Sequence, residues 1–202
     1  MTNQNLPIRI ISKVARGYGR GSKDLGIPTA NVSRENGILR CSCGDFDHLP
    51  TGIYWGFARV GEIFATDGGG DGGGDGGGDD GDDGGGRNYG HSELGKVFIA
   101  AISIGFNPTY KNEEKTVEPH LIAPSTHPRR HASSTGETQF QDFYDKTIVL
   151  SVVGYLRPEL PFEGLEKLTA AIKQDIADSE RLAGQSDNNT SRKTLGRNLL
   201  GK

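Results

Sequence analysis

Five short apolar runs along the chain have the composition and spacing of β-strands. They are rich in β-branched and aromatic residues and are bounded by glycine or polar residues, a pattern typical of strands. Proline inside the fourth run places that strand at a sheet edge or a bulge, because proline has no backbone N–H to donate. The predicted strands are Ile8–Val14, Gly52–Val60, Val97–Ile104, Val117–Ile122 and Thr147–Leu156.

The apolar period changes after the last of these strands. From Gly164 to Ala183, apolar residues recur at helical spacing and acidic residues lie off that stripe, which predicts one amphipathic helix. The stripe is Leu165, Leu168, Ile172 and Ile176, and the acidic residues are Asp175, Asp178 and Glu180. Strands followed by one late helix indicate an antiparallel sheet or barrel with a helix packed on it.

Three polar stretches interrupt or end this pattern within an expected single domain, 1–184. Residues 67–86 consist of 13 Gly and 7 Asp. Such a sequence cannot bury a core, so we interpret 67–96 as a disordered surface insertion between two strands that otherwise form a hairpin. Calcium-binding Gly/Asp repeats are disfavoured, because those repeats carry a recurring apolar residue that is absent here. We expect a surface loop at 123–139 and a flexible polar tail at 185–202.

The seven Asp residues of the Gly/Asp run make the chain acidic overall, although the rest of it carries a net positive charge. The formal charge is −3, with 23 basic and 26 acidic residues, and without the 7 Asp of the run it becomes 23 − 19 = +4. A mildly basic domain suits a small anionic ligand and is too weakly charged for a duplex-DNA binder. The sequence has no apolar run long enough to span a membrane and no apolar core of a signal peptide, so we expect a cytoplasmic protein.

Two cysteines, Cys41 and Cys43, form a C-x-C pair near acidic and histidine residues. Four well-spaced metal ligands are missing, so a zinc site is disfavoured. The prediction for this pair is two free thiols in a surface loop.

The stretch from Ala15 to Val32 is rich in glycine and carries a lysine. Gly17, Gly19 and Gly21 alternate before Lys23. Glycines let a backbone bring its N–H groups close to an anion, and the lysine adds positive charge, so the stretch suits a polyphosphate. The spacing matches neither the P-loop nor the dinucleotide-binding fingerprint, and the catalytic motifs of protein kinases do not follow.

Thr29 and Asn31 stand two residues apart at the end of this stretch. In an extended chain their side chains point the same way, so a hydroxyl and an amide oxygen converge as ligands of Mg²⁺ can. The alternative from spacing alone is a polar loop in which Pro28 and Asn31 shape turns.

Read with later motifs, this stretch resembles the riboflavin kinase family, in its eukaryotic single-function form. The matching segments are GYGRGSKDLGIPTAN (17–31), TGIYWG (51–56), SIGFNPTYKN (103–112), VEPHLI (117–122), DFY (142–144) and VVGYLRPELPF (152–162). The resemblance implies a six-stranded antiparallel β-barrel of Greek-key type with a C-terminal helix. It also implies transfer of the γ-phosphate of ATP to the 5′-hydroxyl of riboflavin, forming FMN.

The resemblance assigns roles to individual residues of this chain. It implies that Glu118 is the general base and that Thr29 and Asn31 hold Mg²⁺, although Mn²⁺ and Zn²⁺ accept the same oxygen ligands. ATP would also contact Gly17, Lys23, Leu121 and Tyr144, and the flavin would contact Arg157 and Phe162.

Each of these roles has a structural alternative. Glu118 could face water on a half-exposed sheet, Phe162 could be a core contact at the helix entry, and Arg157 could form a surface ion pair with Glu159. The chain departs from the family at Ala123, where many members carry a histidine.

Two other functions stay open at this point. One is a non-catalytic β-barrel that binds flavin or nucleotide. The other is a small barrel that binds single-stranded nucleic acid, which a 7% aromatic content and the weak charge disfavour. We expect riboflavin and ATP as the partners, no nucleic acid, no membrane span, and a monomer.

Overall fold

The computed structural model of the chain describes residues 6–16, 27, 29–35, 39–44, 46–61, 95–106, 115–126 and 143–185. Gly17, Lys23, the Gly/Asp run, most of the predicted 123–139 loop and nearly all of the predicted tail lie outside these residues. The described elements are β1 (Ile8–Ala15), β2 (Asn31–Val32), β3 (Arg40–Cys41), η1 (Phe46–His48), β4 (Gly52–Val60), β5 (Val97–Phe106), β6 (Lys115–Ile122), β7 (Thr147–Arg157) and α1 (Leu165–Ala183).

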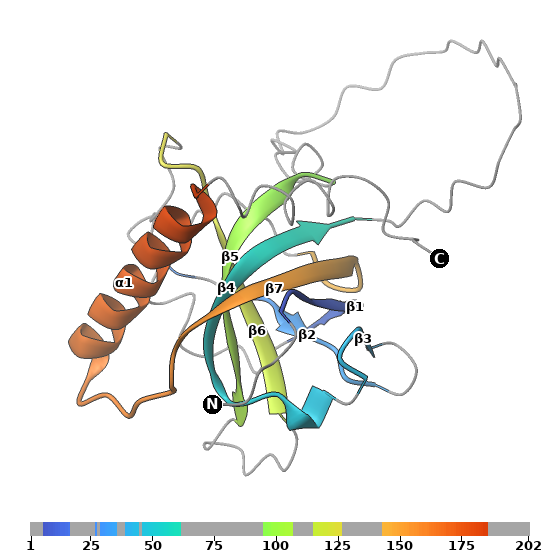
Figure 1. The fold of residues 1–202 in the computed structure, drawn as a ribbon, viewed down its shortest axis with the longest axis horizontal. Helices are drawn as coiled ribbons and strands as arrows, with labels where there is room; N and C mark the ends of the chain where they lie inside the picture. The colour runs from blue at the N-terminus through green and yellow to red at the C-terminus, as the bar shows by residue number, and fades with distance from the viewer. Residues whose placement is uncertain are drawn as a thin grey trace, which may run out of the picture.

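The strands form one antiparallel sheet that curls into a nearly closed barrel (Figure 1). Its order is β2-β1-β7-β4-β5-β6, with β3 paired to β1 off this path. Strands β4, β5 and β6 follow one another, and β7 then returns beside β4, which is the Greek-key connection. The predicted fold, a six-stranded Greek-key barrel with a C-terminal helix, is therefore confirmed, with β3 as an additional two-residue strand.

The two ends of this path approach each other at β2 and β6 (Figure 1). The backbone N–H of Ala30 donates to the carbonyl of Pro119 at 2.9 Å. In an antiparallel ladder the N and C=O of a residue point to the same neighbour, so the nitrogen of Pro119 also points away from β5. Proline therefore removes no hydrogen bond between β5 and β6, whose register runs unbroken from Phe106↔Lys115 to Ile99↔Ile122. The prediction of an edge position is confirmed.

The interior of the barrel holds the main apolar core. Alternate residues of the long strands point inward, and Ile10, Ile102 and Leu150 have no exposed surface. Each such aliphatic side chain contributes about 1.5–3 kcal/mol relative to an exposed one. Val117, Pro119 and Leu121 of β6 are also buried, so Glu118 and His120 lie on the outer face of the barrel, as the two-residue period of a strand requires.

Helix α1 covers part of this outer face (Figure 1). Ile176 packs with Ile27, Ala101 of β5 and Ile122 of β6 in a second apolar cluster. The helix begins at Leu165, one residue after the predicted start, and ends at Ala183 as predicted, but its stripe differs from the prediction. Leu165 is 67% exposed, whereas Asp175, which the pattern placed off the apolar stripe, is only 6% exposed.

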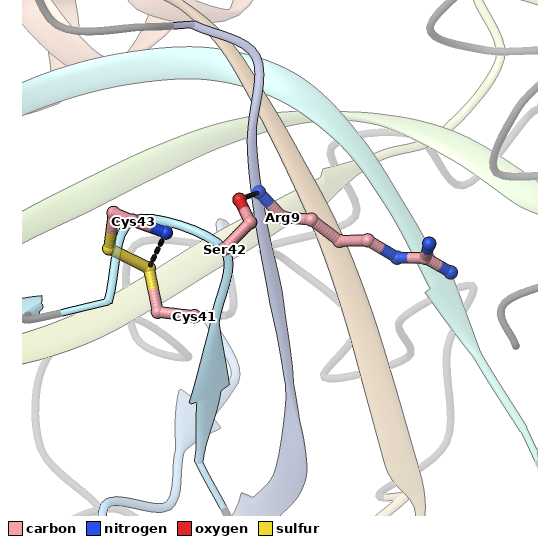
Figure 2. Close-up of a disulfide and its surroundings, with 4 residues drawn as sticks. All are labelled: Arg9, Cys41, Ser42 and Cys43. Carbon is pink, nitrogen blue, oxygen red and sulfur yellow. Dashed lines mark hydrogen bonds between the residues drawn. A yellow bond between two sulfur atoms is a disulfide. The ribbon is translucent and has the colours of Figure 1, made fainter. Parts of the chain in front are cut away.

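The prediction of two free thiols is wrong, because Cys41 and Cys43 form a disulfide (Figure 2). The turn after β3 brings their Cα atoms to 5.2 Å, within the usual range for a disulfide. Ser42 between them exchanges two hydrogen bonds with Arg9 of β1. The Arg9 N–H donates to the Ser42 hydroxyl, and the Ser42 N–H donates to the Arg9 carbonyl, each at 2.8 Å. The disulfide therefore closes a turn fastened to β1.

Candidate active site

The hydrogen bond between Ala30 and Pro119 brings the predicted metal ligands and the predicted base into one region. Ala30 belongs to the barrel core, and Ile27 belongs to the outer cluster beneath α1. Thr29 and Asn31 flank Ala30 in the chain, so they lie on the side facing away from the core. Glu118 is next to Pro119 on the same outer side. The structure thus brings Thr29, Asn31 and Glu118 to one seam of the barrel.

Glu118 is partly buried on β6 and has a fixed local partner. The hydroxyl of Thr116 lies 3.2 Å from Glu118 Oε1 and 3.2 Å from the carbonyl of Gly105 on the neighbouring strand. Burial raises the pKa of Glu118, and the hydrogen bond from Thr116 offsets part of that rise. A glutamate with a raised pKa holds a transferred proton more firmly than an exposed one does. Glu118 is therefore not simply a solvent-facing strand residue, because it is partly buried and hydrogen-bonded to Thr116.

A second carboxylate, Glu159, lies close to Glu118. It sits directly over Gly105, where an added Cβ would come within 2.1 Å of Glu159 Oε1. Glu159 is exposed as a residue, yet partial burial of its carboxylate raises its pKa. The hydrogen bond from Ser103 lowers this pKa, the nearby charge of Glu118 raises it, and the charge of Arg157 lowers it. The absence of a side chain at Gly105 is therefore what admits Glu159 to this surface.

Arg157 and Phe162, the predicted flavin contacts, lie together where β7 leads into α1. The guanidinium carbon of Arg157 lies 5.5 Å from the centre of the Phe162 ring. Arg157 donates from Nε and Nη2 to the two carboxylate oxygens of Asp175 on α1, at 2.8 and 2.7 Å. The alternative for Arg157, a surface ion pair with Glu159, does not describe its main contact. Two nitrogen atoms of its guanidinium donate to Asp175 instead.

The remaining predicted nucleotide contacts lie on two other elements. Leu121 points into the barrel core and is 5% exposed, so its backbone rather than its side chain is available to a ligand. Tyr144 is partly buried in the turn before β7, with the guanidinium carbon of Arg16 4.7 Å from its ring centre. Arg16 directly precedes Gly17, the first of the three alternating glycines, so Tyr144 lies beside the start of the glycine-rich stretch.

Comparison with known proteins gives a family for this arrangement. The Flavokinase family model, described as riboflavin kinase, matches residues 4–183. The chain belongs to the riboflavin kinase family.

Curated riboflavin kinases of fungi and mammals are similar over most of their length. The riboflavin kinase of Aspergillus fumigatus is 33% identical over 174 residues, which cover 84% of this chain and 72% of that protein. The riboflavin kinase of Mus musculus is 34% identical over 182 residues, which cover 88% of this chain and 82% of that protein. The predicted family, in its eukaryotic form, is confirmed.

A solved riboflavin kinase structure has the same fold. The crystal structure from Trypanosoma brucei matches with a TM-score of 0.57 and 17% sequence identity, and covers 98% of this chain and 94% of that one. At this identity the match supports the barrel and helix rather than individual side chains.

Two residues that the structure adds to this candidate site were not predicted from the sequence. Asp175 lies among the polar positions of the helical pattern, and Glu159 was considered only as a surface partner of Arg157. Glu159 stands two residues after Arg157 in the RPELPF motif, and Gly105 lies in the SIGFNPTYKN motif. The occurrence of both positions in family motifs is the signal that could have identified Glu159.

The described residues contain no group of three or more His, Cys, Asp or Glu side chains placed to hold a metal ion. A hydroxyl and an amide oxygen, the donors expected here, are not among those residue types. In the described part of the chain, no helix is both long enough and apolar enough to cross a membrane.

Proposed function

We propose that the chain phosphorylates riboflavin at the seam between β2 and β6, with Glu118 as general base. The carboxylate of Glu118 takes the proton of the ribityl 5′-hydroxyl as that oxygen forms a bond to the γ-phosphorus of ATP. The bond from this phosphorus to the β,γ-bridging oxygen breaks, and the products are FMN and ADP. The observation that carries the proposal is the Ala30–Pro119 hydrogen bond, since it joins the strand of Glu118 to the segment that holds Thr29 and Asn31.

Thr29 and Asn31 would hold a divalent metal ion at this seam. Their hydroxyl and amide oxygens are donors that Mg²⁺ accepts, and both residues lie on the side of the seam that faces away from the core. When bound there, the ion supplies charge neutralisation on the phosphates, the main requirement of phosphoryl transfer. Mn²⁺ and Zn²⁺ are the alternatives that these ligands accept.

The substrates would lie on either side of Glu118. Gly17, Lys23, Tyr144 and the backbone at Leu121 would contact ATP, and Arg157 and Phe162 would contact the flavin. The partly buried guanidinium and the aromatic ring, 5.5 Å apart, suit a flat heteroaromatic ring with carbonyl groups at its edge. The transferred phosphate would then lie between these two halves of the site.

An assay of FMN formation tests this function and its metal ligands together. Purified protein with riboflavin, ATP and Mg²⁺ is expected to form FMN, separated from riboflavin by chromatography. Asn31→Ala and Thr29→Ala should raise the Mg²⁺ concentration needed for half-maximal rate by about tenfold, since each loses one oxygen ligand. Folded wild-type protein that binds both substrates without forming FMN would instead support a non-catalytic flavin- or nucleotide-binding barrel. An unchanged Mg²⁺ requirement in both variants would exclude these residues as ligands.

A further inference from the structure

Asp175 is an unusual residue for the middle of a surface helix. Its side chain is 8% exposed, although carboxylates are rarely buried unless they are paired. Both of its oxygens accept hydrogen bonds from Arg157, at 2.8 and 2.7 Å. This two-point contact fixes the plane of the guanidinium as well as its position.

The two hydrogen bonds to Asp175 leave other N–H donors of the Arg157 guanidinium available for a ligand. Arg157 has five N–H donors, and the described contacts use three of them: two to Asp175 and one from Nη1 to the Pro158 carbonyl at 3.1 Å. The side chain of Arg157 is 22% exposed and lies over the ring of Phe162. Within the described part of the chain, these contacts leave one N–H on Nη1 and one on Nη2 unused.

The same turn of α1 is packed onto the outer face of the barrel. Ile176, the residue after Asp175, belongs to the outer cluster with Ala101 of β5 and Ile122 of β6, and the helix contacts β5. The Ser179 hydroxyl also donates to the Asp175 carbonyl at 2.7 Å within the helix. Asp175 is therefore held on a helix that packs against the barrel through the residue next to it.

We infer that Asp175 is a positioning residue for flavin binding, acting through Arg157. It orients the guanidinium so that its two remaining N–H donors and the ring of Phe162 meet the flat, carbonyl-bearing ring of the substrate. This inference rests on the flavin role proposed above for Arg157. It adds a residue of the C-terminal helix to the flavin half of the site.

The test measures binding of each substrate separately from turnover. Dissociation constants for riboflavin, from its fluorescence, and for ATP, from calorimetry, are compared between wild type and Asp175→Asn. The variant should bind riboflavin about tenfold more weakly, as expected for the loss of a charge-assisted hydrogen-bonded contact, and should bind ATP within twofold of wild type. Equal weakening of both ligands, or an unchanged riboflavin affinity, would overturn the inference.

Asp178→Asn is the matched control on the same helix. Asp178 pairs with Arg181 at 2.8 Å and accepts a hydrogen bond from Gln174, so the variant removes an Asp–Arg pair formed within α1. It should leave both dissociation constants unchanged. A loss of riboflavin affinity equal to that of Asp175→Asn would show a general effect of the helix and contradict the positioning role.

A double-mutant cycle shows whether Asp175 acts through Arg157. If it does, adding Asp175→Asn to Arg157→Ala should cause no further loss of riboflavin affinity. A second tenfold loss in that background would overturn the inference.

Asp175→Glu replaces Asp175→Asn if the latter fails to fold. It retains the charge, but its extra methylene displaces the guanidinium, so it should weaken riboflavin binding and leave ATP binding unchanged. An unchanged riboflavin affinity in Asp175→Glu would also overturn the inference.

The binding measurements separate this inference from the proposed reaction. Wild-type protein that forms FMN, with riboflavin affinity unaltered by Asp175→Asn, leaves the reaction standing and removes the positioning role. The opposite result is a wild-type protein that binds riboflavin but forms no FMN, together with a loss of riboflavin affinity in Asp175→Asn. It would support the positioning role and contradict the proposed reaction.

Discussion

Glu118 differs from an ordinary strand glutamate because of what surrounds it on the outer face of the barrel. Its carboxylate is partly buried, receives a hydrogen bond from Thr116, and lies near a second carboxylate at Glu159. A single sequence shows the alternation that puts Glu118 and His120 on one face, but not whether that face is covered. The nearby carboxylate of Glu159 comes from the segment after β7, which is distant in sequence from β6.

The buried carboxylate carries a stability cost that depends on pH. Because the pKa of Glu118 in the folded protein is raised from its usual 4.5, this group stabilises the fold below that value and loses the contribution as pH rises through the folded pKa. Glu118→Gln has no ionised form to bury. Its melting temperature should therefore exceed that of wild type at about pH 8 and approach or fall below it at about pH 4, as measured by calorimetry. A variant less stable than wild type at the higher pH would contradict the assigned burial.

At the level of elements, the long strands and the helix were predictable and the short ones were not. β4 has the predicted bounds, and β1, β5, β6 and β7 extend the predicted runs by one or two residues, because each is an apolar run with clear borders. β2 and β3 have two residues each, too few to show a period, and they exist because β1 offers them a partner. The burial of Asp175 also depends on a partner, Arg157, that helical spacing does not reveal.

The hairpin of β4 and β5 should tolerate removal of most of its insertion. The two strands pair as far as Arg59↔Val97, and the Gly95 N–H donates to the Val60 carbonyl at 2.7 Å, so their ends are already held together. Deleting residues 67–86 should leave kcat within about twofold. Shortening the connection should stabilise the fold by about 0.6 kcal/mol per halving of length. FMN formation and denaturant unfolding of the deletion variant check both expectations; loss of folded protein or of activity would show that the insertion has a role.

For the molecule as a whole, ordered family motifs carried the prediction further than any local pattern. They implied the barrel, and they predicted a single site formed by Thr29, Asn31, Glu118, Arg157 and Phe162. The structure adds the physical connections between them: the Ala30–Pro119 seam and the Arg157–Asp175 contact. Neither could be derived from the sequence, because each joins segments separated by long stretches of chain. The disulfide was missed because only a metal site and two free thiols were weighed for the C-x-C pair.

Comparison of Glu118→Gln with wild type under saturating riboflavin, ATP and Mg²⁺ tests the central claim most directly. Loss of the base should lower kcat by about 10²–10⁴-fold, while the dissociation constants of riboflavin and ATP stay within about twofold. Glu166→Gln, at an exposed position in the first turn of α1, is the matched control and should keep wild-type activity. A Glu118→Gln variant that forms FMN at the wild-type rate would contradict the assignment of Glu118 as the base.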